Sequence, residues 1–355
     1  MAVGRLRVGI LFGGMSGEHE ISLLSARSVM LAIDREKYVV VPIGITKEGE
    51  WIIQGDPMNA LVGRAEEDRQ AVGDRRRTLA RASVLPNPFP RVDVVFPLLH
   101  GPFGEDGTVQ GLLEMAQIPY VGAGVLASAL GMDKAHMKAV FQQQGLPVAR
   151  FVAIRREEWG RDREASLTRS GTQSYPLFVK PANGGSSVGI SKVASPKDLP
   201  GALELAFRYD RKAVLEEAIE GREIECSVLG NDDPQVSVPG EVVHGNDFYD
   251  YEAKYSDPRT RLVVPAPLDE NLVSRFQELA LAAFRAIDCC GMARVDFFLR
   301  HTDKAILVSE INTIPGFTPM SMYPRLWEAS GMTFPELIAR LIQLGLEKHG
   351  NKRGI

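Results

Sequence analysis

Short apolar runs separated by helical patterns organise the first third of the chain. Three of these runs have the length and composition of buried strands, namely Arg7–Phe12, Val39–Ile45 and Val92–His100. Helical patterns follow the first run at 21–33 and the third run at 108–116. Strands that alternate with helices are typical of a parallel α/β sheet, whose ligands bind beyond the carboxyl ends of the strands. The pattern predicts such a domain in residues 1–122, with a charged insertion at 47–91.

Residues 123–215 predict a second unit with a different pattern. A helix at 133–144 leads into a strand. After a polar connection, the stretch 175–193 predicts a strand, a loop rich in glycine and serine, and a returning strand. Residues 216–355 predict a third unit, in which the amphipathic helix 272–287 leads into a pair of apolar runs.

This pair of apolar runs, at 293–312, is where the sequence predicts the chemistry. The polar turn His301–Lys304 separates the runs, so we expect a β-hairpin whose side chains alternate between two faces. Pairing of the two strands can bring four polar side chains together, namely Arg294, Asp296, Glu310 and Asn312. Carboxylate and amide oxygens are hard ligands of the kind that Mg²⁺ uses alongside water and nucleotide phosphates. A solvated face with ordinary ion pairs is the plainer alternative.

The turn that follows the hairpin, Thr313–Thr318, favours the functional interpretation. Gly316 in this turn can offer a backbone N–H to an anion. Arg294 on the hairpin suits a developing oxyanion or a transferring phosphoryl group. A cation-binding face and an anion-binding turn would then be neighbours in the sequence.

Two glycine-rich turns follow strands in the first domain. The turn Gly13–Glu20 leads into a helix and lacks the G-x-G-x-x-G pattern of dinucleotide-binding proteins. Its Glu18 either caps the helix and complements the helix dipole or binds the ammonium group of a ligand. The second turn begins after His100, whose place at the carboxyl end of a strand favours a role in a site over plain packing.

The loop within 175–193 has the composition of a phosphate-binding loop. Its backbone N–H groups and the hydroxyls of Ser186 and Ser187 can fold over phosphates, with Lys180 as a point charge. It is not a Walker A loop, because no Gly-Lys-Ser/Thr leads into a helix, and a plain flexible hairpin is the alternative. Acidic residues within 214–225 can accept hydrogen bonds from an adenine amine or a ribose. The aromatic and charged stretch 244–261 predicts a lid.

Composition and charge exclude several classes of protein. The 355 residues are 45% hydrophobic and 24% charged, which is typical of a soluble globular protein with two or three domains. A net charge of −4, without a stripe of Lys and Arg, argues against a nucleic-acid partner. No apolar run reaches the roughly 18 residues of a membrane span. The N-terminus lacks a secretory pattern, and three cysteines without metal-ligand spacing favour reduced thiols in the cytoplasm.

Six segments together resemble the ATP-grasp ligases and, within them, the D-alanine:D-alanine ligase family, over nearly the whole chain. These segments are Gly13–Glu20, His100–Gly107, Lys180–Gly189, Tyr249–Tyr255, Arg294–Asp296 and Glu310–Gly316. The resemblance implies an α/β (α+β ATP-grasp) fold of three domains, with ATP between the central and C-terminal ones. It also implies that ATP converts one D-alanine into an acyl phosphate, that the amine of a second D-alanine attacks it, and that the dipeptide serves peptidoglycan synthesis.

Carried over position by position, the resemblance implies which residues bind ATP and its metal ions. The ligands of two Mg²⁺ ions, which Mn²⁺ could replace, would be Asp296, Glu310 and Asn312. The residues that meet phosphates would be Lys134, Lys180, Ser187 and Lys254. The residues that surround adenosine would be Glu216, Ile219 and Glu223.

The same resemblance implies substrate-binding and catalytic roles. The catalytic set would be Glu18, His100, Ser186, Tyr255, Arg294 and Gly316. The substrate-binding set would be Glu18, His100, Arg294, Gly316 and Ser321. Glu18 would hold the ammonium group of the first D-alanine through a hydrogen-bond chain with Ser186 and Tyr255. Arg294 and the Gly316 N–H would form the oxyanion hole, and Ser321 would anchor the carboxylate of the second substrate.

Two positions bear on how far the resemblance extends. Glu217 stands where some members of the family place a lysine near adenine, which affects the expected adenine contacts. Tyr255 is absent from relatives that make D-alanyl-D-lactate, so its presence favours an amine as the nucleophile. The alternatives are a D-alanine:D-lactate ligase, another ATP-grasp carboxylate-amine ligase, and a non-catalytic nucleotide-binding regulator. The family usually dimerises through its N-terminal domain, so we expect a homodimer.

Overall fold

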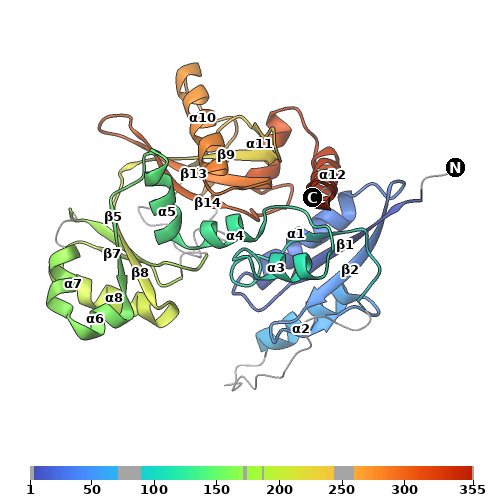
Figure 1. The fold of residues 1–355 in the computed structure, drawn as a ribbon, viewed down its shortest axis with the longest axis horizontal. Coiled ribbons are helices and arrows are strands. Elements are labelled where there is room, and N and C mark those ends of the chain that lie inside the picture. Colours follow the sequence, from blue (N-terminus) through green and yellow to red (C-terminus); the bar gives the residue numbers. More distant parts are fainter. Residues whose placement is uncertain (1–3, 71–88, 171–173, 186–187, 244–259, 354–355) are drawn as a thin grey trace.

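Three β-sheets carry the chain in the computed structural model, which describes residues 4–70, 89–170, 174–185, 188–243 and 260–353. We call them the N-terminal, central and C-terminal sheets. In Figure 1 they lie at the right, at the lower left and at the top of the molecule, respectively. Residues of both the central and the C-terminal sheet line one cavity.

The N-terminal sheet is largely parallel and has the strand order β3-β2-β1-β4. Its strands are β1 Leu6–Gly13, β2 Tyr38–Ile45, β3 Trp51–Ile52 and β4 Val94–Pro97. Strand β1 pairs in parallel with β2 and β4, and the edge strand β3 is antiparallel. The helices of this region are α1 His19–Ala32, α2 Pro57–Gln70 and α3 Thr108–Met115. The predicted parallel sheet is confirmed, and the predicted insertion contributes β3 and α2.

The central sheet is antiparallel and has the order β5-β8-β6-β7. Its strands are β5 Phe151–Arg155, β6 Leu177–Pro181, β7 Ser191–Val193 and β8 Lys212–Glu217. The helices α6 Arg156–Arg161, α7 Arg163–Ser170 and α8 Leu199–Tyr209, with the short 3₁₀ helix Pro196–Asp198, complete this region. Buried leucines of β6, β8 and α8 form its core. The predicted strand, loop and returning strand of 175–193 are confirmed as β6 and β7.

The C-terminal sheet is also antiparallel and has the order β12-β11-β9-β13-β14, with β10 paired to β9. Its strands are β9 Gly221–Gly230, β10 Gln235–Val236, β11 Gly240–Val243, β12 Arg261–Val263, β13 Gly291–Arg300 and β14 Ile306–Asn312. The helices α4 Val125–Met132, α5 Lys134–Gln143 and α10 Glu270–Ala286 share a core with this sheet. Aromatic side chains of α5 and α10, including Phe141 and Phe276, are fully buried there. Helix α5 is thereby fixed to the C-terminal sheet although it precedes the central sheet in sequence.

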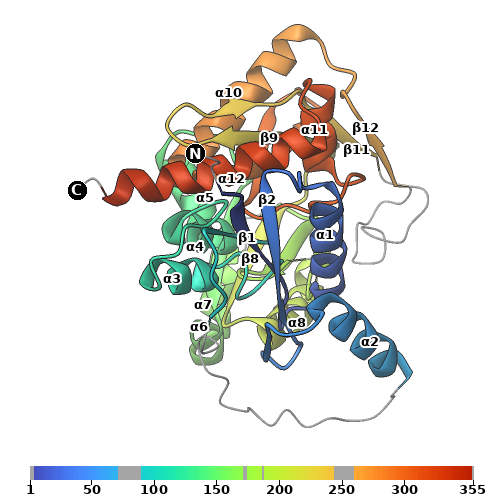
Figure 2. The ribbon, with the colours of Figure 1, turned by 90° about the vertical axis from the view of Figure 1, so that its right-hand side faces the viewer.

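The last two helices, α11 Met322–Ala329 and α12 Phe334–Arg353, return the chain to the N-terminal sheet. Ile338 and Leu341 of α12 belong to one buried cluster with Val8 of β1 and Phe96 of β4. Figures 1 and 2 show α12 beside the N-terminal sheet. Residues from both ends of the chain therefore share a core.

The predicted domain limits at residues 122 and 215 stay a prediction. Strand β8 crosses the second of these limits, and its last residues belong to the central sheet. Over the part of the chain that the structure describes, no helix has both the length and the apolar composition that a membrane crossing needs.

Candidate active site

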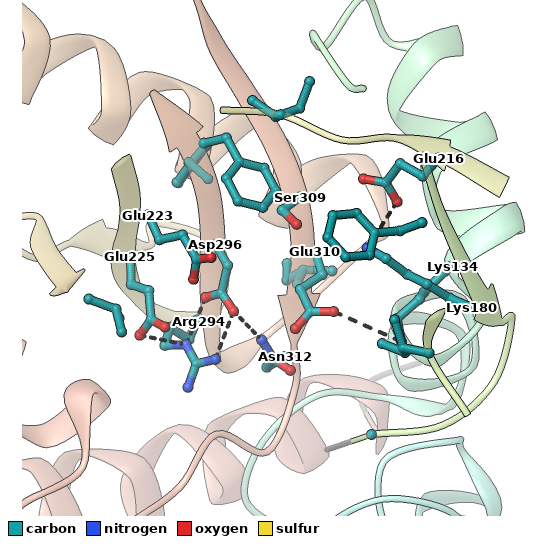
Figure 3. Close-up of a pocket in the computed structure, with 18 of the residues that line it drawn as sticks. Lys134, Lys180, Glu216, Glu223, Glu225, Arg294, Asp296, Ser309, Glu310 and Asn312 are labelled. Carbon is teal, nitrogen blue, oxygen red and sulfur yellow. Dashed lines mark hydrogen bonds and ion pairs between the residues drawn. The ribbon is translucent and has the colours of Figure 1, made fainter. Parts of the chain in front are cut away.

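A cavity of about 680 Å³ opens between the central and C-terminal sheets. Strands of both sheets line it: β6 and β8 on one side, and β9, β13 and β14 on the other. The start of α5 and the loop after β6 also contribute to the wall. Figure 3 shows the charged side chains of these elements pointing toward one another. The cavity therefore gathers residues from stretches that are far apart in the sequence.

The predicted hairpin of β13 and β14 is confirmed, and it brings the four predicted polar residues together. Arg294 lies opposite Asn312, and Asp296 lies opposite Glu310 in the antiparallel register. Beyond this point the register shifts, because Phe297 pairs with Val308. Ser309 is therefore the extra residue of a β-bulge. Ser309 and Glu310 line the cavity, as do the three residues that follow them.

Arg294 is surrounded by carboxylates. Its Nε and Nη2 atoms donate to the two carboxylate oxygens of Asp296, each at 2.7 Å. Its Nε atom also lies 3.0 Å from Oε2 of Glu225 on β9. Burial by itself would lower the pKa of Arg294, but Asp296 and Glu225 raise it well above its ordinary value. The guanidinium is thus a fixed positive charge in the wall of the cavity.

The hairpin face has the donor set of a hard cation. Across the described residues, no three His, Cys, Asp or Glu side chains converge as a metal site. The donors on this face are two carboxylates and the amide of Asn312. Asn312 donates from Nδ2 to Oδ2 of Asp296 at 2.9 Å, which leaves its amide oxygen for a cation. With Glu310 opposite Asp296, these oxygens fit a magnesium ion that takes its other ligands from phosphates and water.

Lys134 links the glycine loop to the hairpin. It is the first residue of α5, and Asp133 caps that helix by accepting from the N–H groups of Ala135 and His136. The ammonium group of Lys134 donates to the carbonyl oxygen of Gly184 at 2.8 Å and lies 3.9 Å from Oε2 of Glu310. A cation here can bind an anion that enters between the loop and the hairpin.

Glu216 on β8 is buried between two lysines. Its Oε2 atom lies 3.2 Å from Nζ of Lys180 on β6, and its Oε1 atom lies 3.2 Å from Nζ of Lys138 on α5. Burial would raise the pKa of Glu216, but Lys138 and Lys180 lower it below its ordinary value. The carboxylate is therefore ionised and fixed at both oxygens.

Lys138 is a residue of this site that the sequence analysis missed. A lysine in an amphipathic helix usually lies in solvent with its charge exposed, but this one is 1% exposed. The one available signal was its spacing of four residues from Lys134, which places both side chains on the same face of α5.

The other predicted adenosine residues, Ile219 and Glu223, line the cavity. Glu217 also lines it. Its carboxylate accepts from the backbone N and from Nε of Arg150, at 3.0 and 2.9 Å. The charge of Glu217 is therefore paired with Arg150 on the connection that leads into β5.

Glu18 lies where the N-terminal region meets the cavity, which it lines. Left-handed Gly13 (φ +93°) ends β1, and a Cβ atom there would lie 2.1 Å from the carbonyl oxygen of Ile45. Oε2 of Glu18 lies so close to two other glycines that a Cβ atom on Gly101 or Gly185 would meet it at 2.8 or 2.7 Å. Small residues therefore make room for the Glu18 carboxylate beside the glycine loop.

Three predicted residues lie outside the wall of the cavity: His100, Gly316 and Ser321. His100 is buried, and its ring nitrogens contact the hydroxyl of Ser25 at 3.1 Å and the carbonyl oxygen of Ile314 at 3.0 Å. Ser321 is the N-cap residue of α11, and its hydroxyl accepts from the N–H of Thr318 at 3.1 Å. His100 thus holds the turn that contains Gly316, and the roles predicted for all three stay predictions.

Four predicted residues lie outside the described residues: Ser186, Ser187, Lys254 and Tyr255. The predicted hydrogen-bond chain from Glu18 and most of the predicted lid at 244–261 fall there too. Their roles stay predictions.

Two family profiles match the chain. The family described as "D-ala D-ala ligase N-terminus" matches residues 7–123, and the family described as "D-ala D-ala ligase C-terminus" matches residues 140–343. Two curated relatives named D-alanine--D-alanine ligase are similar over almost their full length. The protein from Natranaerobius thermophilus is 48% identical, covering 98% of this chain and 97% of the relative. The protein from Halothermothrix orenii is 51% identical, covering 97% and 99%.

Solved structures agree with these matches. The D-alanine-D-alanine ligase from Coxiella burnetii superposes with a TM-score of 0.83 at 37% identity, covering 99% of this chain and 97% of that chain. The VanG D-Ala:D-Ser ligase from Enterococcus faecalis superposes with a TM-score of 0.82 at 37% identity, covering 96% and 100%. The predicted three-domain ATP-grasp fold class is confirmed. With both profiles matched in order and relatives near 50% identity along the whole chain, the chain belongs to the D-alanine--D-alanine ligase family.

Proposed function

We propose that this chain is an ADP-forming ligase that joins two D-alanine molecules into D-alanyl-D-alanine, a precursor for peptidoglycan synthesis. Membership of the family supports the reaction. The observation that carries it in this chain is the face of the β13–β14 hairpin, where Arg294 lies between the carboxylates of Asp296 and Glu225 beside a large cavity. A plain nucleotide-binding regulator would not need a guanidinium and a cation-binding face in the same wall.

ATP is the cosubstrate, and we assign it to the cavity between the central and C-terminal sheets. Its adenosine would contact Glu216, Ile219 and Glu223. Its phosphates would meet the ammonium groups of Lys134 and Lys180, together with Ser187 and Lys254. Lysines are suited to this task because they present compact charges to phosphate oxygens.

We assign two Mg²⁺ ions, or Mn²⁺ in their place, to the oxygens of Asp296, Glu310 and Asn312. A bound ion would neutralise charge on the phosphate oxygens during transfer. Arg294, which shares the oxygens of Asp296, would stay beside the reacting group as a second positive charge. The site would then act by positioning and electrostatic stabilisation.

The reaction would proceed in two steps. The carboxylate of the first D-alanine, held through its ammonium group by Glu18, attacks the γ-phosphorus of ATP, which forms the acyl phosphate and releases ADP. The amine of the second D-alanine, whose carboxylate is anchored by Ser321, then attacks the acyl carbon. Arg294 and the N–H of Gly316 stabilise the resulting oxyanion, and its collapse expels inorganic phosphate. Ser186, Tyr255 and His100 would keep Glu18 and the oxyanion turn in place.

The second substrate is a separate question, because the superposed structures include a ligase whose name specifies D-serine. The relatives near 50% identity are named for D-alanine, which favours D-alanine as the second substrate. Tyr255 favours an amine over the hydroxyl of D-lactate. The D-alanine:D-lactate ligase and other carboxylate-amine ligases are therefore the weaker alternatives.

Three further expectations accompany this function. We infer a homodimer that forms through the N-terminal region, and a cytoplasmic location, where ATP and the substrates are available. We also propose that the three domains span residues 1–122, 123–215 and 216–355.

ADP release from the purified protein with ATP and Mg²⁺ tests the function. D-Alanine alone should support turnover and give the dipeptide by mass spectrometry, whereas L-alanine should not. D-Alanine mixed with D-serine or D-lactate should give mainly D-alanyl-D-alanine. Glu310→Gln, which removes one ligand charge, should abolish turnover and keep the melting temperature. ATP binding without turnover on any of these substrates would refute the proposal.

A further inference from the structure

Lys138 on α5 is the most deeply buried charge beside the cavity, and it makes two contacts. Its ammonium group lies 3.2 Å from Oε1 of Glu216 on β8. It also donates to the carbonyl oxygen of Ser309 on β14 at 3.1 Å. One side chain thus connects the central sheet and the C-terminal sheet, from a helix that is packed on the latter.

The contact with Ser309 falls at a point where the backbone lacks a strand partner. β14 is an edge strand of the C-terminal sheet, and Ser309 is the extra residue of its bulge. A bulge leaves its extra residue outside the ladder and bends the strand at that position. The next residue is Glu310, so the direction of the Glu310 carboxylate depends on this bend. The Lys138 ammonium group fixes this bend through the carbonyl oxygen of Ser309.

Lys138 and Lys180 both contact Glu216, but they differ in their access to the cavity. Lys180 lines the cavity and Lys138 does not. A ligand phosphate can therefore draw the ammonium group of Lys180 away from Glu216, but it cannot reach Lys138. Lys138 would then remain as the counter-ion of the buried Glu216 carboxylate. Without it the carboxylate would be buried and unpaired, which is strongly unfavourable.

We propose that Lys138 is a positioning residue that aligns the two ends of the nucleotide site, holding Glu216 at the base end and the bulge before Glu310 at the phosphate end. This inference rests on the proposed function, which assigns the base of ATP to one end of the site and its phosphates to the other. Lys138 touches no ligand, and it acts through the two groups that its ammonium contacts.

Lys138→Met, which keeps the length of the side chain and removes its charge, tests the proposal. Loss of hydrogen bonds to a charged group should raise the KM for ATP by about tenfold or more and lower kcat by a similar factor. The KM for D-alanine should change less than about twofold. Lys197→Met, at an exposed lysine of the central region, is the matched control and should behave as wild type. A Lys138→Met enzyme with wild-type KM for ATP and kcat would overturn the proposal, whatever its melting temperature.

A double-mutant cycle with Glu216→Gln separates the two contacts and also serves if Lys138→Met fails to fold. In the double variant no buried carboxylate has lost a counter-ion, so folding should be retained. If Lys138 acts on the base end through Glu216, the double variant should have the same KM for ATP as Glu216→Gln alone. Its kcat should still fall further, because the Ser309 contact is lost as well. Additive effects on KM would overturn the role at Glu216, and an unchanged kcat would overturn the role at Ser309.

Equilibrium dialysis of ATP in the absence of D-alanine tests the role of Lys138 independently of the proposed ligase reaction. Lys138→Met should weaken that binding by about tenfold even if the amino acid substrate were different. A wild-type protein that binds ATP but ligates nothing would refute the proposed function and leave the role of Lys138 to be decided by this binding measurement. Equal ATP affinity in wild type and Lys138→Met would refute the role of Lys138 alone.

Discussion

Strand β13 carries two arginines that make the same kind of ion pair in different surroundings. Arg294 binds Asp296 with two hydrogen bonds, and Arg300 binds Asp303 in the same two-pronged way at 2.9 and 2.7 Å. Arg294 is buried among carboxylates at the cavity, whereas the Arg300 pair is at the exposed hairpin turn. An exposed pair contributes little, but a buried one cannot lose a partner without leaving a charge unpaired.

Replacing each arginine by lysine should therefore separate chemistry from ordinary ion pairing. Arg294→Lys should lower kcat by about a hundredfold or more, because lysine cannot bind Asp296 with two parallel bonds while facing an oxyanion. Arg300→Lys should leave kcat and the melting temperature near wild type. Steady-state ADP release gives kcat for both variants. Equal decreases in kcat would show that the two parallel hydrogen bonds of Arg294 have no special role in the reaction.

The sequence could identify site residues only where a local pattern, such as alternation along a strand, placed them. Arg294 and Asp296 could be found because alternation along a strand put them on one face. Lys138 could not be found, since its burial arises from Glu216 and Ser309, which come from distant strands. His100 was singled out only by its place at the end of a strand, and its contacts with Ser25 and Ile314 depend on tertiary packing.

At the scale of elements, the β13–β14 hairpin followed from alternation and a polar turn. The bulge at Ser309 did not, because nothing in Ser-Glu-Ile-Asn distinguishes an extra residue from a regular strand residue. The apolar positions along α12 recur at helical spacing. They do not identify its packing partner, since an apolar face predicts burial and does not say against which sheet.

Helix α11 is joined to the C-terminal sheet by a buried hydroxyl. Tyr323 of α11 donates from its hydroxyl to the carbonyl oxygen of Val228 on β9 at 3.0 Å. Burial raises the pKa of Tyr323 above its ordinary value of 10.0. The folded protein therefore holds the proton to a higher pH than the unfolded chain does. Stability from this group is fully present below about pH 10 and is lost as the pH rises toward the folded-state pKa.

Tyr323→Phe should change the alkaline stability in a defined way. Near pH 8 it should cost about 1 kcal/mol, through the lost hydrogen bond. Between about pH 10 and 11 the variant should lose stability less steeply than wild type, by about 1.4 kcal/mol per pH unit at most. Urea unfolding at each pH measures both effects, with the exposed Tyr209→Phe as control. Parallel curves for wild type and Tyr323→Phe would contradict the role of this buried hydroxyl.

At the scale of the molecule, the two ends of the chain share a core. The cluster that contains Val8 and Phe96 of the N-terminal sheet also contains Ile338 and Leu341 of α12, all fully buried. The N-terminal region, which presents Glu18 to the cavity, is thereby fixed to the region that carries the hairpin. A substrate held by Glu18 can then be aligned with groups on β13 because the two regions pack together.

Leu341→Ala should show whether this shared core couples the regions. Removing most of a buried leucine side chain should cost about 2–5 kcal/mol, and the N-terminal and C-terminal regions should still melt in one transition at a lower temperature. Leu31→Ala, at a leucine that is 78% exposed on α1, should change stability by less than about 0.5 kcal/mol. Differential scanning calorimetry measures both. A separate early transition in Leu341→Ala would show that the N-terminal sheet unfolds independently, and the alignment of Glu18 with the hairpin would then need another cause.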